Sequence, residues 1–114
     1  MTQTQMPKDR MLRVRVTYGE NSVSIALKGE VDMSTAPELL ESVQLAFARN
    51  PTSIVLDVGE LAYIDSVGLG VLVTVYKRAQ VAATEFVLSA PTGRMLRLLE
   101  ITGLKDVFAV GESV

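Results

Sequence analysis

The chain has 114 residues, which is enough for one domain with a single hydrophobic core. It contains no histidine and no cysteine, which excludes disulfides, thiolate zinc sites and the imidazole group that most acid–base catalysis uses. Its net charge is −2 and its basic residues are scattered, so it lacks the cationic face expected of a nucleic-acid-binding protein. We therefore expect a protein that is not an enzyme, needs no cofactor and does not contact nucleic acid directly.

The polar residues 1–10 lack the apolar core of a signal peptide and are expected to be flexible. The longest apolar run, Val67 to Tyr76, has only about half the length of a membrane span. We expect a cytoplasmic protein without membrane contact, built as a flexible N-terminus followed by one domain over residues 11–111.

The first two predicted elements form a β-hairpin. Residues 12–17 alternate between apolar and polar side chains, which is the period of a half-buried strand. Residues 23–28 repeat this alternation after a turn at residues 19–21. The short connection predicts that the two strands pair antiparallel.

A helix is predicted next. Thr35 and Glu38 have the spacing of a capping box, and Pro37 suits the first turn of a helix. Apolar residues spaced three and four apart continue the pattern to Phe47, and the Asn-Pro pair at 50–51 ends it.

The central part of the chain predicts a strand followed by a helix. Residues 53–58 are mostly apolar and β-branched, which is typical of a strand covered on both faces. A loop is expected from there to Ile64. The next helix is expected to begin at Ser66, because serine is a natural N-cap, and its apolar residues extend over 69–79.

The last elements complete an alternating order. Residues 85–89 predict a strand, residues 92 or 93 to 101 a helix that ends at Gly103, and residues 107–110 a short final strand. The order β-β-α-β-α-β-α-β predicts an α/β fold: a mixed, mostly parallel β-sheet with an N-terminal β-hairpin and packed α-helices.

Two acidic-hydroxyl pairs are expected at one edge of this sheet. Asp32 and Ser34 follow the second strand, and Asp65 and Ser66 follow the third strand and its loop. Parallel strands end at the same edge, so these residues should lie near one another. Both residue types are also common in loops and caps, which leaves a purely structural role open. Two carboxylates alone rarely hold Mg²⁺, so no metal site is predicted.

The helix after Ser66 carries an exposed strip on the face opposite its apolar side. On a helical wheel the strip contains Gly70, Thr74 and Lys77, with Val67 and Val73 at its borders. Small and apolar residues with a single cation suit a partner that approaches closely, since a solvated face normally carries more charge. A simple solvated surface is the alternative.

The sequence lacks residues that known catalytic and nucleotide-binding motifs require. Ile64 stands where a nucleophile elbow around Ser66 needs glycine. The glycines in residues 68–70 lack the partners of a P-loop or a dinucleotide site. A receiver domain phosphorylated on Asp57 would need an acidic pair after the first strand, where residues 17–19 are Thr-Tyr-Gly.

Three segments resemble the STAS domain family, and among its members the small bacterial anti-anti-sigma factors. Gly29-Glu30-Val31-Asp32 is similar to the element after the family's second strand. Ile64-Asp65-Ser66-Val67-Gly68-Leu69 is similar to its phosphorylation motif, although Val67 stands where the family usually has Ser, Ala or Thr. Residues 98–104 with 107–108 resemble its last helix and strand. The segments occur in the family's order across residues 12–110.

The resemblance implies a STAS-like fold and an anti-sigma factor antagonist. In this family the unphosphorylated protein binds an anti-sigma factor that is also a GHKL-type serine kinase, and so releases a sigma factor. Phosphorylation of the serine at the position of Ser66 switches binding off, and a serine phosphatase resets the protein. The predicted partner-binding residues are Asp32, Ser34, Asp65, Ser66, Val67, Gly70, Val73, Thr74 and Lys77.

Two other functions stay open at this point. One is a non-switching STAS scaffold in a signalling or transport complex, in which Ser66 is only a cap. The other is a nucleotide-binding module, suggested only by carboxylates and helix starts at one edge. We expect a monomer or a weak homodimer.

Overall fold

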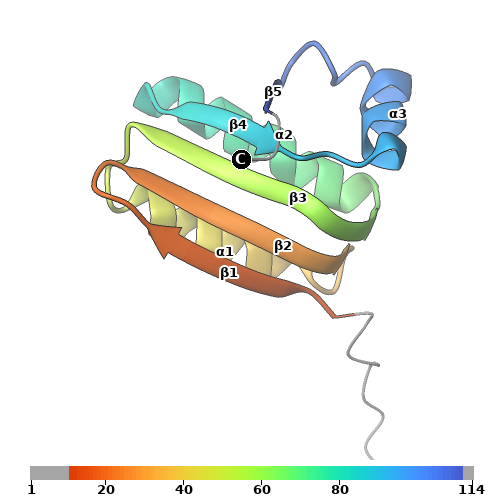
Figure 1. The fold of residues 1–114 in the computed structure, drawn as a ribbon, viewed down its shortest axis with the longest axis horizontal. Coiled ribbons are helices and arrows are strands. Elements are labelled where there is room, and N and C mark those ends of the chain that lie inside the picture. The colour runs from red at the N-terminus through yellow and green to blue at the C-terminus, as the bar shows by residue number, and fades with distance from the viewer. Residues whose placement is uncertain (1–10, 112–114) are drawn as a thin grey trace, which may run out of the picture.

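The computed structural model describes residues 11–111, and within them five strands and three helices follow one another in the predicted order (Figure 1). The predicted flexible N-terminus, residues 1–10, lies outside the described residues. The strands are β1 (Arg13–Tyr18), β2 (Ser22–Val31), β3 (Ser53–Ile64), β4 (Glu85–Ser89) and β5 (Ala109–Gly111). The helices are α1 (Ala36–Phe47), α2 (Ser66–Ala82) and α3 (Gly93–Thr102).

The strands form one mixed sheet in the order β1-β2-β3-β4-β5. β1 pairs antiparallel with β2, from Arg13 opposite Lys28 to Tyr18 opposite Val23, and this confirms the hairpin. The remaining neighbours pair parallel. The predicted α/β fold with a mostly parallel sheet is therefore confirmed.

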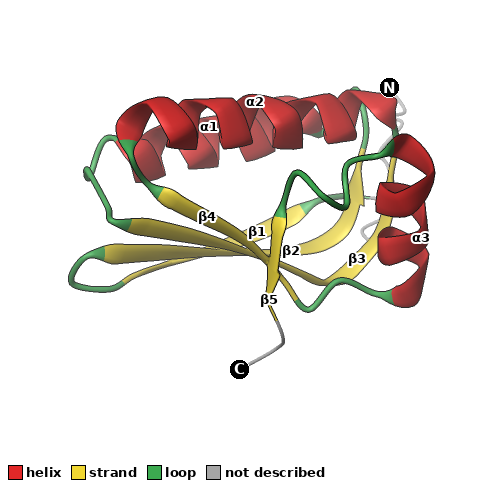
Figure 2. Ribbon diagram, turned by 90° about the horizontal axis from the view of Figure 1, so that it is seen from above, coloured by secondary structure: helices red, strands yellow, loops and turns green. Residues whose placement is uncertain are grey.

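The helices are arranged so that one face of the sheet is covered. Figure 2 shows α1 and α2 side by side over one face, with α3 at one end of the sheet. On β3, Ile54 and Leu56 point towards these helices and are buried, whereas Val55 and Asp57 on the other face are half-buried. The prediction that this strand is covered on both faces is wrong, because α1 and α2 pack on the same side.

β3 is longer than predicted. The residues from Gly59 to Ile64, expected to be a loop, continue the strand and pair with β2 as far as Val31 opposite Ile64. The described pairing of β2 with β3 contains two register shifts. Such bulges insert unmatched residues and interrupt the two-residue alternation by which a strand is recognised, and so the sequence pattern hides this extension.

Gly29 lies within β2 rather than after it, so the segment Gly29–Val31 belongs to the strand. Its φ of 113° is a conformation that L side chains rarely adopt, and a Cβ at this position would collide with the backbone oxygen of Met11. The close approach of the chain before β1 therefore requires glycine here.

The hydrophobic core lies between the sheet and α1 and α2. Its largest fully buried side chains include Ile25, Leu27, Leu39, Ile54, Leu56, Leu72, Leu88 and Leu99. α3 begins and ends as predicted: Thr92 Oγ1 accepts a hydrogen bond from Met95 N at 3.2 Å, and Gly103 closes the helix with a φ of 76°. None of the helices in residues 11–111 has the length and apolar character needed to cross a bilayer.

Candidate functional site

The ends of β2 and β3 bring the two acidic-hydroxyl pairs to one edge of the sheet. Val31 and Ile64 are opposite each other in the last register pair of these strands. The N–H of Asp65 donates to the backbone oxygen of Val31 at 3.1 Å. Asp32 and Asp65 therefore begin neighbouring connections, as the sequence predicts.

Asp65 is the N-cap of α2. Its backbone is extended, with φ −101° and ψ −173°, and its Oδ1 accepts a hydrogen bond from the backbone N–H of Gly68 at 2.9 Å. The prediction that Ser66 caps this helix is wrong, because Ser66 is already the first helical residue. The carboxylate one position earlier satisfies the free N–H group instead.

The Ser66 side chain is exposed, and its hydroxyl makes no hydrogen bond to any described residue. It lies in the first turn of α2, where the helix dipole is positive and favours an added negative charge. No existing interaction within residues 11–111 would have to break for this oxygen to accept a phosphoryl group.

The predicted strip runs along the exposed side of α2. Gly70, Thr74 and Lys77 are exposed, Val67 is 43% exposed and Val73 is half-buried, so the predicted placement is confirmed. A Cβ built on Gly70 has no described atom within 4 Å. The strip is therefore open at Gly70.

The opposite side of α2 is packed tightly. Its buried residues are Gly68, Leu69, Leu72, Val75 and Ala79, and Tyr76 is half-buried. A Cβ on Gly68 would lie 2.5 Å from Ile64 Cγ1 and 2.8 Å from Val31 Cγ1. Because position 68 has no room for a side chain, glycine there lets the start of α2 pack closely against the ends of β2 and β3, and this packing places Ser66.

Asp32 orders the connection between β2 and α1. Its Oδ1 accepts hydrogen bonds from Ser34 Oγ at 2.7 Å, Ser34 N at 2.8 Å and Thr35 N at 3.1 Å. The bond from the Ser34 hydroxyl, opposed by some loss of solvation and aided by the backbone N–H groups, lowers the pKa of Asp32. The carboxylate is thus ionised, and its Oδ1 is already bonded to neighbouring residues of the same connection. The Ser34 side chain is exposed.

The predicted capping box at the start of α1 does not form. Thr35 makes no side-chain hydrogen bond to the helix. Its Oγ1 instead accepts from Asp32 N at 3.0 Å and donates to the backbone oxygen of Glu30 at 2.9 Å. The buried Thr35 hydroxyl therefore connects the start of α1 to the end of β2. Glu38, the other residue of the predicted box, is exposed on the helix surface.

The sequence reasoning missed two exposed apolar residues at the same edge. Met33, between Asp32 and Ser34, is 76% exposed, and Tyr63, just before the end of β3, is 49% exposed. Met33 had a signal in the sequence, a large apolar side chain within a polar connection, whereas Tyr63 lies among apolar residues of β3 and had none. With Val67 they add apolar surface around the polar groups, which is typical of a protein-binding site.

Among the described residues, no three side chains of His, Cys, Asp or Glu come together in a way that could hold a metal ion. What the arrangement offers is one accessible hydroxyl at a helix start, surrounded by small and apolar surface.

The comparisons with known proteins agree with this geometry. The family described as "Mlab, STAS domain" matches residues 14–110. The anti-sigma-B factor antagonist of Listeria monocytogenes is 35% identical over 88 residues, which are 77% of either chain. A crystal structure of an anti-sigma factor antagonist from Mycobacterium paratuberculosis superposes with a TM-score of 0.81 at 25% identity, covering 94% of this chain and 90% of that one. The Bacillus protein SpoIIAA in its phosphorylated form shares the fold, with a TM-score of 0.72 at 20% identity over 90% of this chain and 92% of that one. The chain therefore belongs to the STAS domain family.

Proposed function

We propose that this protein is an anti-sigma factor antagonist whose binding surface is switched off by phosphorylation of Ser66. The observation that carries the proposal is the exposed, unbonded hydroxyl of Ser66 beside the capping carboxylate of Asp65. Membership of the STAS family and the similarity to an anti-sigma-B factor antagonist support it. The partner is an anti-sigma factor of the GHKL type that is also a serine kinase, and a serine phosphatase resets the switch.

In the unmodified state the partner docks on the strip of α2 and on the adjoining edge of the sheet. Gly70 allows the partner's backbone or side chains to approach α2 closely. Burying the exposed parts of Val67, Met33 and Tyr63 supplies the hydrophobic contribution to binding. Asp32 and Ser34 shape the neighbouring connection and present polar groups at the rim.

Phosphorylation would change this surface without changing the fold. It adds about −1.5 to −2 charge at neutral pH. The start of α2 tolerates the charge, and its capping bond, from Gly68 N to Asp65 Oδ1, does not involve Ser66. The phosphorylated protein SpoIIAA has the same fold as this unmodified chain. The dianion would prevent docking because it must lose water at a closing interface that is apolar, beside the negative charge of Asp65.

Incubation with ATP and a candidate kinase, followed by intact-mass measurement, tests the acceptor. We expect a gain of about 80 Da, one phosphoryl group, that is lost in Ser66→Ala. Ser34→Ala is the matched control, because Ser34 is another exposed serine at the same edge and its variant should still be modified. A phosphoryl group located on Ser34, or full labelling of Ser66→Ala, would exclude Ser66 as the acceptor.

Partner binding tests the switch. Ser66→Asp should keep the circular dichroism spectrum and lose kinase binding, while Ser66→Ala should bind and never be released by phosphorylation. If Ser66→Asp binds the kinase as tightly as the wild type does, the switch mechanism is wrong.

The second candidate is a non-switching STAS scaffold. Val67 favours it, because this exposed branched side chain stands in the contact strip directly after Ser66. A scaffold would bind its partner equally well as Ser66→Ala, Ser66→Asp or wild type, so the same binding measurements distinguish it from the switch.

A further inference from the structure

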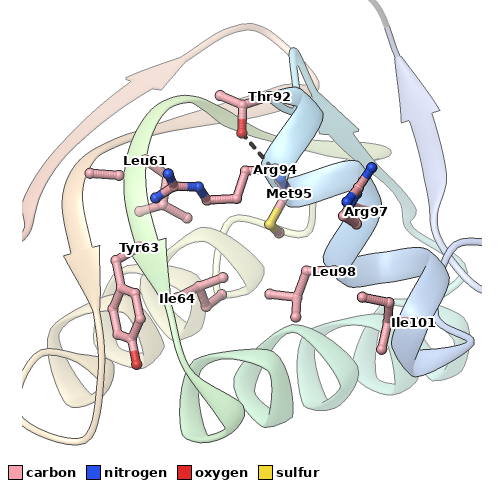
Figure 3. A pocket seen from close by; sticks show the side chains of 10 residues that line it. Leu61, Tyr63, Ile64, Thr92, Arg94, Met95, Arg97, Leu98 and Ile101 are labelled. Carbon is pink, nitrogen blue, oxygen red and sulfur yellow. Dashed lines mark hydrogen bonds between the residues drawn. The ribbon is translucent and has the colours of Figure 1, made fainter.

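A cavity of about 370 Å³ lies between the end of β3 and α3 (Figure 3), and no residue of the α2 strip lines it. It exists because β4 pairs with β3 only as far as Ser89 opposite Asp57, while β3 continues to Ile64. No described strand therefore fills the space between this extension and α3. Figure 3 shows Met95 and Leu98 pointing from α3 into that space.

The cavity is apolar inside. Leu61 and Ile64 from β3 and Met95, Leu98 and Ile101 from α3 form most of its wall. Ile101 is 75% exposed, so the α3 side of the cavity is partly open to solvent. The volume falls in the range of about 300–1,000 Å³ that is usual for small-molecule sites.

The opening of the cavity carries only positive charge. Arg94 and Arg97 line it and are exposed, and the described lining contains no Asp or Glu. Neither arginine forms an ion pair with a carboxylate of residues 11–111. In Figure 3 the side chain of Arg94 extends from α3 towards β3, beside Leu61.

We propose that this cavity binds an anionic amphiphile: a single aliphatic chain that ends in a carboxylate, as in a medium-chain fatty acid. The chain would lie against Met95, Leu98 and Ile101, where it loses contact with water. The carboxylate would accept two parallel hydrogen bonds from the guanidinium of Arg94, with Arg97 adding charge at the opening. Tyr63 lines this cavity as well as the proposed docking surface, but Ser66 does not line it, and the proposal does not depend on the proposed switch.

An extended peptide fits this place less well. Pairing with β3 would need a regular free edge, but its described pairing with β2 has register shifts at this end. Bulges of this kind twist an edge away from further strand pairing. The geometry thus favours a flexible chain over a peptide backbone.

Methyl NMR titration of the full-length protein with decanoate, below its micelle concentration, tests the proposal. We expect saturable shifts at the methyl groups of Met95, Leu98 and Ile101. Decanol, without charge, should bind about tenfold more weakly, as expected for the loss of one charge-assisted contact, and decyltrimethylammonium more weakly still. Equal binding of all three compounds, or the absence of saturation, would overturn the proposal.

Variants of lining residues test where the carboxylate of decanoate binds. Arg94→Gln should weaken decanoate binding about tenfold, and it should hardly change decanol binding. Arg13→Gln is the matched control, because Arg13 is an exposed arginine on β1, outside this cavity. Ile101→Ser removes an exposed part of the wall, so it should weaken both ligands while the thermal melt stays unchanged. An Arg13→Gln effect as large as that of Arg94→Gln would overturn the proposal. So would cavity shifts that follow protein concentration alone, because a second copy would then be the occupant.

Discussion

Asp65 and Ser66 are adjacent, but only Asp65 should contribute to stability. Asp65→Ala removes the 2.9 Å hydrogen bond that caps α2 and a negative charge at the helix start. Loss of an N-cap costs typically about 1 kcal/mol and loss of the charge about 0.3–1 kcal/mol, so a decrease of about 1–2 kcal/mol in the free energy of unfolding is expected. Ser66→Ala should stay within about 0.5 kcal/mol of wild type, because its exposed hydroxyl is not bonded to any described residue.

Urea unfolding followed by circular dichroism measures this difference. With a slope of about 2 kcal/mol per molar urea, Asp65→Ala should lower the midpoint by about 0.5–1 M, and Ser66→Ala should leave it within about 0.25 M. Asp65→Asn separates the two contributions, because it keeps an oxygen acceptor for Gly68 N and removes only the charge. It should lower stability by about 0.3–1 kcal/mol.

The outcome that would refute this reasoning is simple. If Ser66→Ala lowers the midpoint as much as Asp65→Ala does, the serine hydroxyl caps α2 in solution. It would then not be free to accept a phosphoryl group without a cost in stability.

Other variants test the packing around the site. Gly68→Ala should destabilise the protein by about 1–3 kcal/mol, because its Cβ would meet Ile64 at 2.5 Å. Gly70→Ala, in the same helix, should stabilise it by about 0.5–1 kcal/mol in the same urea experiment, and its added methyl group should weaken partner binding. An NMR pH titration should give Asp32 a pKa below the ordinary value of an aspartate, and Ser34→Ala should raise it. Because the pKa of Asp32 is lowered in the folded protein, the ionised carboxylate stabilises the fold above its unfolded pKa, and this stabilisation is lost as the pH falls through the folded pKa. Ser34→Ala removes the main cause of the lowered pKa, so acid should reduce the stability of this variant less steeply than that of wild type. Gly29→Ala should cost more than about 1 kcal/mol, because residues other than glycine are strained at positive φ.

The hydrophobic pattern was enough to predict most of the fold. The β1–β2 hairpin, the two faces of α2 and the bounds of β4 follow from periods of two and 3.6 residues, because burial against one core selects those periods directly. The edge at which Asp32 and Asp65 meet follows from parallel topology alone.

Features that depend on pairing between distant residues could not be predicted. The extension of β3 to Ile64 is stabilised by β2 across register shifts, which leave no local alternation. The predicted cap at Ser66 was wrong, and Thr35, although it is the N-cap residue of α1, does not make the predicted side-chain capping bond. A capping residue is determined by where the preceding strand stops, and that point is set by the neighbouring strand. The cavity beside α3 has no local signal, since it results from unequal lengths of β3 and β4.

The capping of α2 by Asp65 has a consequence for protein engineering. Because the neighbouring carboxylate already caps the helix, we expect substitutions at position 66 to change folding stability little. A cysteine there could carry a fluorophore that reports docking, and a threonine could redirect the protein to a kinase of different preference. Residue 66 is thus a position at which new chemistry can be introduced, because residue 65 caps the helix.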